Sequence, residues 1–185
     1  MIDVNDLRKG VTFEYDSNLY MVLDYHHHKP GRGNATIRVK IVNLRSGTIV
    51  EQTFTSGVRV QDVRLDFHIV QFLYSDGDFY HFMDLDTYEQ PALGKEIVGD
   101  AGLYLKEGME CKLTFYQGQP LDIELPLTVD MQVVESEMAV RGDTATGVTK
   151  KITTETGLQV QVPGFVDVGD VIRINTSTGS YVTRV

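Results

Sequence analysis

Hydrophobic and polar positions alternate along most of this chain. In residues 11–15, 158–162 and 171–175 the apolar side chains recur at every second position, which is the period of a β-strand with one buried face. Turn signals rich in Gly, Asp, Asn and Ser separate such stretches at short intervals. Only residues 92–106 predict a helix, and three glycines interrupt it. The pattern therefore predicts an all-β chain of small barrels or sandwiches.

Two breaks divide the chain into segments of similar length. The strand that ends at Arg64 and Leu65 is followed by a new aromatic-rich run, and Pro126 cannot donate a hydrogen bond within a sheet. Segments of about 60 residues are of a size at which a barrel gains stability by packing on a neighbour. We therefore predict domains at residues 1–63, 64–126 and 127–185.

One segment has the pattern of a basic hairpin. Residues 25–50 contain no Asp or Glu, although the chain around them is acidic. Residues 36–41 alternate between Thr, Arg or Lys and Ile or Val, so Arg38 and Lys40 fall on one face of the predicted strand. The basic side chains are therefore expected in a row.

The tip loop of this hairpin, residues 29–35, is longer than a two-residue turn requires. Gly31 and Gly33 permit positive φ, and Pro30 fixes its own φ and keeps the residue before it extended. We therefore expect Arg32 to project from the end of the hairpin. Its guanidinium is a planar fork of N–H donors that suits phosphate, carbonyl and base edges.

The formal net charge of −9 is unevenly distributed. Residues 1–63 hold 8 basic and 7 acidic side chains, residues 64–126 hold 4 and 12, and residues 127–185 hold 5 and 7, which gives net charges of +1, −8 and −2. An acidic middle disfavours a protein that coats nucleic acid non-specifically. Any contact with RNA must therefore be local and made by side chains at specific positions.

The chain has the features of a cytoplasmic protein. No apolar run approaches the length of a membrane span, and the N-terminus lacks the basic start and apolar core of a signal peptide. The single cysteine, Cys111, cannot form an internal disulfide, which fits a reducing compartment. The alternation around Cys111 predicts a small buried hydrophobe. We expect no membrane partner.

Three consecutive histidines, His26, His27 and His28, suggest a metal site. On a strand the outer two share a face and the middle one points away, so they offer at best two ligands, with no nearby Cys. We interpret them as polar stem residues of the hairpin and expect no metal.

Short acidic motifs occur at Asp84 and Asp86 and at Asp76 and Asp78. Acidic residues around turns are usually solvated, and neither motif is long enough to predict a metal loop. The chain also lacks a nucleophile elbow, a phosphate-cradling loop before a helix, and a Cys/His pair with an orienting group. We therefore expect a protein that is not an enzyme and has no cofactor.

Two motifs lie far apart in the chain. One is the tip Lys29-Pro30-Gly31-Arg32-Gly33-Asn34-Ala35, and the other is a C-terminal set made of Arg141-Gly142-Asp143-Thr144, Lys150, Gly157, Val160, Val162, Pro163, Phe165, Val166, Gly169, Asn175, Thr176, Thr178, Gly179, Tyr181 and Arg184. In both motifs, and over its full length, the chain resembles the bacterial elongation factor P family, whose tip loop and C-terminal residues follow this order and spacing. Two separate motifs in register make coincidence improbable.

The resemblance implies an L-shaped protein with a tRNA-like outline, in which an SH3-like or KOW-like N-terminal barrel precedes two OB-fold barrels. Such factors bind the 70S ribosome between the P and E sites as monomers and relieve stalling at consecutive prolines by positioning the P-site peptidyl-tRNA. The resemblance places the tip residues Lys29, Gly31, Arg32, Gly33 and Asn34 at the acceptor end of that tRNA.

The same resemblance assigns roles in the C-terminal domain. Gly142, Asp143 and Thr144 would form a loop near the E-site mRNA, and Tyr181 and Arg184 would face the small subunit and tRNA. Arg32 stands at the position that carries a post-translational extension in many members. An Arg there disfavours modification by lysyl transfer and leaves open both glycosylation by a tip-modifying enzyme and an unmodified tip.

Two alternatives remain at the level of sequence. One is an elongation factor P-like paralogue. The other is a general OB-type RNA-binding module that acts away from the ribosome, with base-stacking aromatic side chains on a barrel face. Its candidates are Phe72, Tyr74, Phe79, Tyr80 and Phe82, which we instead expect in the core of the second barrel.

Overall fold

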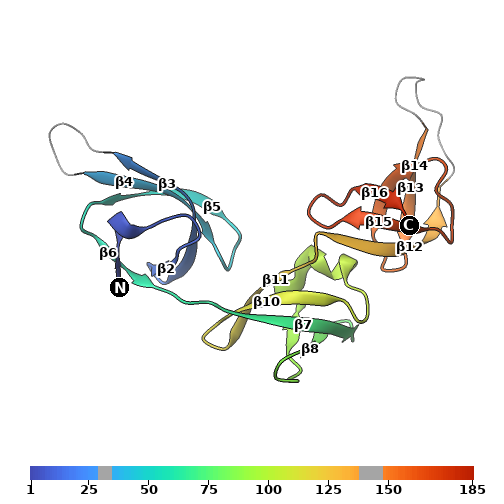
Figure 1. Cartoon of the computed structure of the whole chain (residues 1–185), viewed down its shortest axis with the longest axis horizontal. Helices are drawn as coiled ribbons and strands as arrows, with labels where there is room; N and C mark the ends of the chain where they lie inside the picture. The colour runs from blue at the N-terminus through green and yellow to red at the C-terminus, as the bar shows by residue number, and fades with distance from the viewer. Residues whose placement is uncertain (29–34, 138–147) are drawn as a thin grey trace. The chain divides into compact units, whose positions relative to one another are not determined.

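The structure is a computed structural model, which describes residues 1–28, 35–137 and 148–185. Over these ranges the chain folds into three β-sheets, and its helices are short, which confirms the predicted all-β class (Figure 1). The chain divides into two compact units. Unit 1 comprises Met1–Asp66 with Phe115–Leu121, and unit 2 comprises Phe67–Thr114 with Asp122–Val185.

The first sheet has the strand order β1-β6-β2-β3-β4-β5. Its strands are β1 (Ile2–Asp3), β2 (Thr12–Tyr15), β3 (Asn18–His28), β4 (Thr36–Asn43), β5 (Ile49–Thr55) and β6 (Arg59–Asp62), with the 3-10 helix η1 at Val4–Asp6. The inward side chains form one core, made of Val4, Leu7, Phe13, Val22, Ile37, Val39, Ile41, Phe54 and Val60. This core supports the hairpin of β3 and β4.

The central sheet has the order β11-β10-β7-β8-β9. Its strands are β7 (Asp66–Ser75), β8 (Phe79–Asp84), β9 (Ala92–Gly94), β10 (Glu110–Tyr116) and β11 (Gln119–Glu124). Between β9 and β10 lie α1 (Lys95–Val98) and the 3-10 helix η2 (Gly99–Tyr104). The helix predicted over residues 92–106 is therefore shorter, because its first three residues pair as β9 and Gly99, at φ +51, ends α1.

The third sheet has the order β14-β13-β12-β15-β16. Its strands are β12 (Thr128–Ser136), β13 (Thr149–Thr154), β14 (Gln159–Pro163), β15 (Val171–Asn175) and β16 (Tyr181–Arg184). Inside unit 2 it contacts the segment after α1, since Tyr104 and Met109 pack against its core and the Lys106 ammonium lies 2.9 Å from a Glu155 carboxylate oxygen. These contacts join the second and third sheets into one compact unit.

Two further features bear on the sequence predictions. In the part of the chain that the structure describes, no helix has the length and apolar character needed to cross a bilayer. Cys111 on β10 is buried, as predicted, and burial raises the pKa of its thiol to about 12. The division at residues 63 and 126 stays a prediction.

Candidate nucleic-acid interface

The β3–β4 hairpin forms an extended stalk. Its antiparallel pairing continues to its end, where His28 lies opposite Thr36 and His26 lies opposite Arg38 (Figure 1). The three histidines are therefore stem residues, as predicted. The tip residues Lys29, Gly31, Arg32, Gly33 and Asn34 lie outside the described residues, and their roles stay predictions.

The two faces of β4 differ as the sequence predicts. Ile37 and Val39 are 0% exposed, whereas Arg38 and Lys40 are exposed. Directly opposite residues of an antiparallel pair share a face. Arg38 lies opposite His26 on one side and Thr53 on the other, so the three side chains form a row across the outer face of the sheet.

Lys40 has a different neighbourhood from Arg38. Its cross-strand partners are Asp24 on β3 and Glu51 on β5, which flank the acid-free segment in the sequence. Lys40 therefore has two acidic neighbours in the sheet, although the sequence segment around it contains no Asp or Glu. Asp24 Oδ2 also lies 3.2 Å from His26 Nε2. Arg38 is the less compensated of the two cations.

A cleft of about 440 Å³ lies at the end of the stalk. Its lining residues are His26, His27, His28, Thr36, Arg38 and Thr53. Imidazole, hydroxyl and guanidinium groups are donors to phosphate oxygens, which are the main hydrogen-bonding groups of a nucleic-acid backbone. Among the described residues no group of three or more His, Cys, Asp or Glu is arranged to hold a metal ion.

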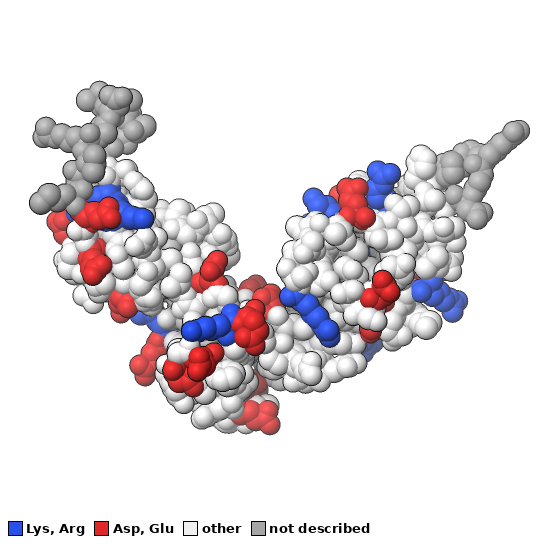
Figure 2. All heavy atoms as spheres, turned by 180° about the vertical axis from the view of Figure 1, so that it is seen from behind, with Lys and Arg blue, Asp and Glu red and all other residues white. Residues whose placement is uncertain are grey.

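The surface charge is mixed rather than uniformly basic. On the face in Figure 2, Lys and Arg side chains are interspersed with Asp and Glu, and the described residues form no continuous basic surface there. Contact with RNA would therefore depend on a few placed cations, such as Arg38, rather than on a broad positive field.

The two C-terminal residues singled out by sequence lie on β16. Tyr181 packs against the core of the third sheet. The Arg184 guanidinium lies 3.4 Å from Asp170 and 5.5 Å from the ring centre of Phe165, which is itself exposed. Gly142, Asp143 and Thr144 lie outside the described ranges. The proposed contacts of all five residues stay predictions.

Comparison with known proteins decides the family. Elongation factor P of Thermotoga maritima is 49% identical over 184 residues, and that of Moorella thermoacetica is 46% identical over 184 residues; each alignment covers 100% of both chains. This chain belongs to the elongation factor P family. Family membership makes it a translation elongation factor, of a kind that associates with the ribosome.

The family models of elongation factor P follow one another along the chain. The KOW-like domain matches residues 3–60, the OB domain residues 65–123 and the C-terminal domain residues 129–184. The predicted KOW-like start and OB architecture are thereby confirmed.

Solved structures agree with this architecture. The eukaryotic translation initiation factor 5A from Methanococcus jannaschii aligns with a TM-score of 0.56 at 26% identity, over 67% of this chain and 91% of that one. An initiation factor eif-5a family protein from Naegleria fowleri aligns with a TM-score of 0.51 at 14% identity, over 67% of this chain and 96% of that one, which supports the fold alone.

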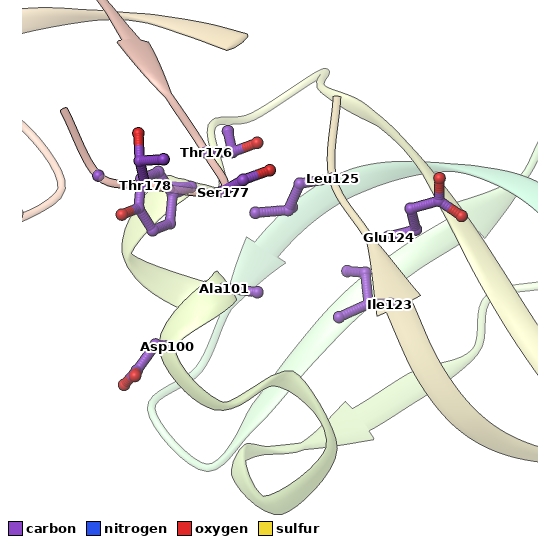
Figure 3. A pocket seen from close by; sticks show the side chains of 10 residues that line it. Asp100, Ala101, Ile123, Glu124, Leu125, Thr176, Ser177 and Thr178 are labelled. Carbon is purple, nitrogen blue, oxygen red and sulfur yellow. The ribbon is translucent and has the colours of Figure 1, made fainter. Parts of the chain in front are cut away.

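One pocket was not predicted from the sequence. It measures about 490 Å³ within unit 2 and lies between η2, the end of β11 and the turn before β16. Figure 3 shows the apolar side chains of Ala101, Ile123 and Leu125 toward its middle, with Asp100 and Glu124 at its edges. Its lining contains carboxylates but no Lys or Arg, so the pocket does not suit an RNA phosphate.

Asp84 corrects one sequence interpretation. Its carboxylate is buried instead of solvated. It accepts the N–H groups of Asp86 and Thr87, and its Oδ2 lies 2.6 Å from His68 Nδ1. These hydrogen bonds lower the pKa of Asp84, with the bond from Thr87 contributing most. Asp84 organises the turn after β8, which a short acidic motif could not reveal.

The aromatic residues of the central sheet divide between its two faces. Phe72 and Phe82 are buried in the core, as predicted, and Tyr80 lies half-buried beside Phe72. The core assignment is wrong for Tyr74 and Phe79, which are exposed. A β-bulge between Phe72 and Tyr74 interrupts the alternation of β7, and Phe79 lies on the face of β8 opposite to Phe82.

Proposed function

We propose that this elongation factor binds the ribosome between the P and E sites and relieves stalling at consecutive prolines by positioning the P-site peptidyl-tRNA. The β3–β4 hairpin is the observation that carries the proposal. It is paired up to His28 and Thr36 and presents the row of His26, Arg38 and Thr53 on an outer face. A paired stalk can hold the tip loop away from the barrel, and its donors suit a tRNA backbone.

The chemistry of proline explains why positioning is enough. The ring fixes φ and makes the proline nitrogen a poorly oriented nucleophile. Ordering the acceptor end of the tRNA brings the reacting groups into line, which accelerates the step without a protein acid or base. The factor would therefore act without catalytic residues of its own and without a cofactor.

The charge distribution fits a factor that contacts RNA in one binding pose. A first domain of net charge +1 tolerates RNA phosphate, whereas residues 64–126, with net charge −8, disfavour binding to rRNA in other poses. The proposal includes cytoplasmic action as a monomer with three domains, divided at residues 63 and 126. It also includes contact of Tyr181 and Arg184 with the small subunit and tRNA, and of residues 142–144 with E-site mRNA.

The test is a reconstituted translation assay with a Pro-Pro-Pro reporter. Arg32→Ala is expected to abolish rescue while the melting temperature stays unchanged, because substitutions outside a packed core contribute little to folding and the sequence predicts that Arg32 projects from the hairpin. Arg45→Ala, which removes an exposed arginine from the turn between β4 and β5, is the matched control and should rescue normally. Full rescue by Arg32→Ala would refute the role of the tip. Intact mass of the protein from its native host shows whether Arg32 is modified.

The alternative function is an RNA-binding module that acts away from the ribosome, and the exposure of Tyr74 and Phe79 is the observation in its favour. The acidic side chains around these rings oppose it, since they repel phosphate. Cosedimentation with ribosomes in competition with short RNA oligonucleotides separates the two functions. Retention on ribosomes in the presence of excess oligonucleotide supports the elongation-factor role.

A further inference from the structure

The outer face of the central sheet carries an exposed aromatic cluster. Tyr74 on β7 is 55% exposed and Phe79 on β8 is 48% exposed. Tyr74 lies opposite His81, and the two rings stack with their centres 4.5 Å apart and their planes 20° apart. Phe79 lies two residues before His81 on the same face of β8, a diagonal neighbour of Tyr74 within reach of aromatic side chains. We name Tyr74, Phe79 and His81 the aromatic platform.

The neighbouring strand leaves the platform uncovered. Phe79 lies opposite Gly94 and His81 lies opposite Ala92, so β9 presents no large side chain beside either ring. The space beside Gly94 is instead occupied by the Glu96 carboxylate, which a Cβ at position 94 would overlap. The Glu96 carboxylate therefore lies next to the backbone position that faces Phe79 across the strand pair.

A second carboxylate borders the platform from the turn between β7 and β8. Asp76 Oδ2 lies 2.8 Å from His81 Nε2, and Asp76 Oδ1 accepts the N–H groups of Asp78 and Phe79. The hydrogen bond from His81, followed by those of Phe79 and Asp78, lowers the pKa of Asp76 to about 2. Asp76 is therefore ionised throughout the physiological range and fixed in orientation.

The sequence around the platform is acidic. Residues 66–105, which include Glu96, contain eight Asp or Glu and a single basic residue, Lys95. A phosphate backbone would be repelled from this face, whereas a cation would be attracted. In the OB fold, the face of strands 2 and 3 and the loop between strands 1 and 2 are common ligand-binding surfaces. In the central sheet these are β8, β9 and the turn at residues 76–78.

We propose that the aromatic platform binds an arginine side chain from a basic protein segment. A guanidinium stacks on the faces of Tyr and Phe, and its N–H fork donates in the ring plane to carboxylates at the edges. Phe79 and Tyr74 supply the ring faces, and Glu96 and Asp76 supply the acceptors. A lysine ammonium offers the charge but neither the flat stacking surface nor the fork.

The test uses the full chain and three probes at one fixed ionic strength: an oligoarginine peptide, an oligolysine peptide of equal length, and an oligouridine. Fluorescence anisotropy of the labelled probes measures each affinity. The oligoarginine is expected to bind about two- to fivefold more tightly than the oligolysine, as a cation–π contact at a partly exposed site allows. The labelled oligouridine, measured without peptide, is expected not to bind, because the carboxylates repel its phosphates.

The double variant Tyr74→Ala with Phe79→Ala is expected to lose the preference for arginine over lysine while it retains the weaker, charge-driven binding. Tyr88→Ala is the matched control, because Tyr88 is 71% exposed in the turn that follows the other end of β8, and it should keep the preference. If the double variant fails to fold, Glu96→Gln provides the test instead. This substitution leaves both rings in place, and it should weaken oligoarginine binding.

Three results would overturn the proposal. These are equal affinity for oligoarginine and oligolysine in the unmodified protein, an undiminished preference in the folded double variant, or direct binding of the labelled oligouridine as tight as that of the oligoarginine. The last result would instead identify the platform as a base-stacking surface. None of these depends on the tip loop, so the rescue assay with Arg32→Ala is judged separately.

Discussion

Arg173 on β15 and Asp130 on β12 form a two-point ion pair across the third sheet. Arg173 Nε lies 2.7 Å from Asp130 Oδ1, and Nη2 lies 2.8 Å from Oδ2. The two residues are direct cross-strand neighbours, so strand pairing places their side chains on the same face of the sheet. The Lys106 ammonium donates to the carbonyl of Asp130 and also meets Glu155. This small network joins the third sheet to the segment that follows η2.

Replacing Arg173 by Lys should weaken the pair without removing its charge, because an ammonium cannot make both parallel bonds. Both side chains are about two-fifths exposed, so solvent screens the pair and its effect is small. We expect the melting temperature to fall by about 1–3 °C. Differential scanning calorimetry measures this, and a fall as large as that of a core truncation would contradict the assignment of a surface pair.

The same network predicts a stability change with acid pH. Arg173 lowers the pKa of Asp130, and Lys106 lowers the pKa of Glu155, each below the ordinary values of 3.8 and 4.5. A carboxyl with a depressed folded-state pKa stabilises the fold above its ordinary pKa, and this contribution is lost as the pH falls through the depressed value. Stability should therefore decrease between about pH 5 and pH 2.

Lys106→Met tests the contribution of Glu155 to that decrease. Without the ammonium, Glu155 loses the main cause of its depressed pKa, so the unfolding free energy should fall less steeply with pH over the same interval. Lys151→Met, which removes an exposed lysine on β13, is the control and should leave the slope unchanged. Urea denaturation at a series of pH values measures both. Identical slopes for Lys106→Met and the unmodified protein would contradict the linkage.

Truncating the core beneath the stalk should destabilise the first sheet. Ile37→Ala removes a side chain that is 0% exposed beneath the outer row, and such truncations cost about 2–5 kcal/mol. Ile49→Ala, on the adjacent strand but 54% exposed, should change stability by no more than about 0.5 kcal/mol. Chemical denaturation of both variants provides the comparison. A similar cost at the two positions would show that β4 does not bury its inner face.

Cys111 should be unreactive in the native protein. Its thiol is 3% exposed, and burial raises its pKa to about 12, so both access and thiolate content are low. We expect a thiol reagent at pH 8 to modify Cys111 only when the domain opens, at a rate that rises with denaturant. Mass spectrometry of alkylated protein measures the rate, and modification as fast as that of a free thiol would contradict the burial.

The sequence alone predicts those features that depend on local periodicity. The alternation in residues 36–41 suffices to assign Arg38 and Lys40 to the outer face, because a strand places alternate side chains on opposite faces whatever its partner. The neighbours of Lys40 could not be predicted in this way. Asp24 becomes its neighbour through the register of β3 with β4, and Glu51 through the register of β4 with β5. The first of these registers contains a bulge between Val22 and Asp24.

A second bulge explains why Tyr74 was misassigned. Phe72 and Tyr74 would share a face in a regular strand, so a core position for one predicts the same for the other. The bulge between them in β7 turns Tyr74 outward, where it meets His81. Bulges leave no reliable mark in a single sequence, and the aromatic platform is visible only once the register is known.

The contrast between Arg38 and Lys40 provides a quantitative test of the RNA-facing stalk. If Arg38 meets a tRNA phosphate, Arg38→Ala should weaken binding to ribosomes that carry P-site tRNA. The slope of the logarithm of the binding constant against the logarithm of the salt concentration should also become smaller in magnitude by about 0.7 to 0.9. Lys40→Ala should have a smaller effect, because Asp24 and Glu51 already flank that ammonium. Binding measured over a range of salt concentrations distinguishes a lost phosphate contact from a misfolded variant. A lost phosphate contact changes the slope, whereas a lost fold lowers the bound fraction at every salt concentration. Equal slopes for Arg38→Ala and the unmodified factor would mean that the outer face of the stalk points away from RNA.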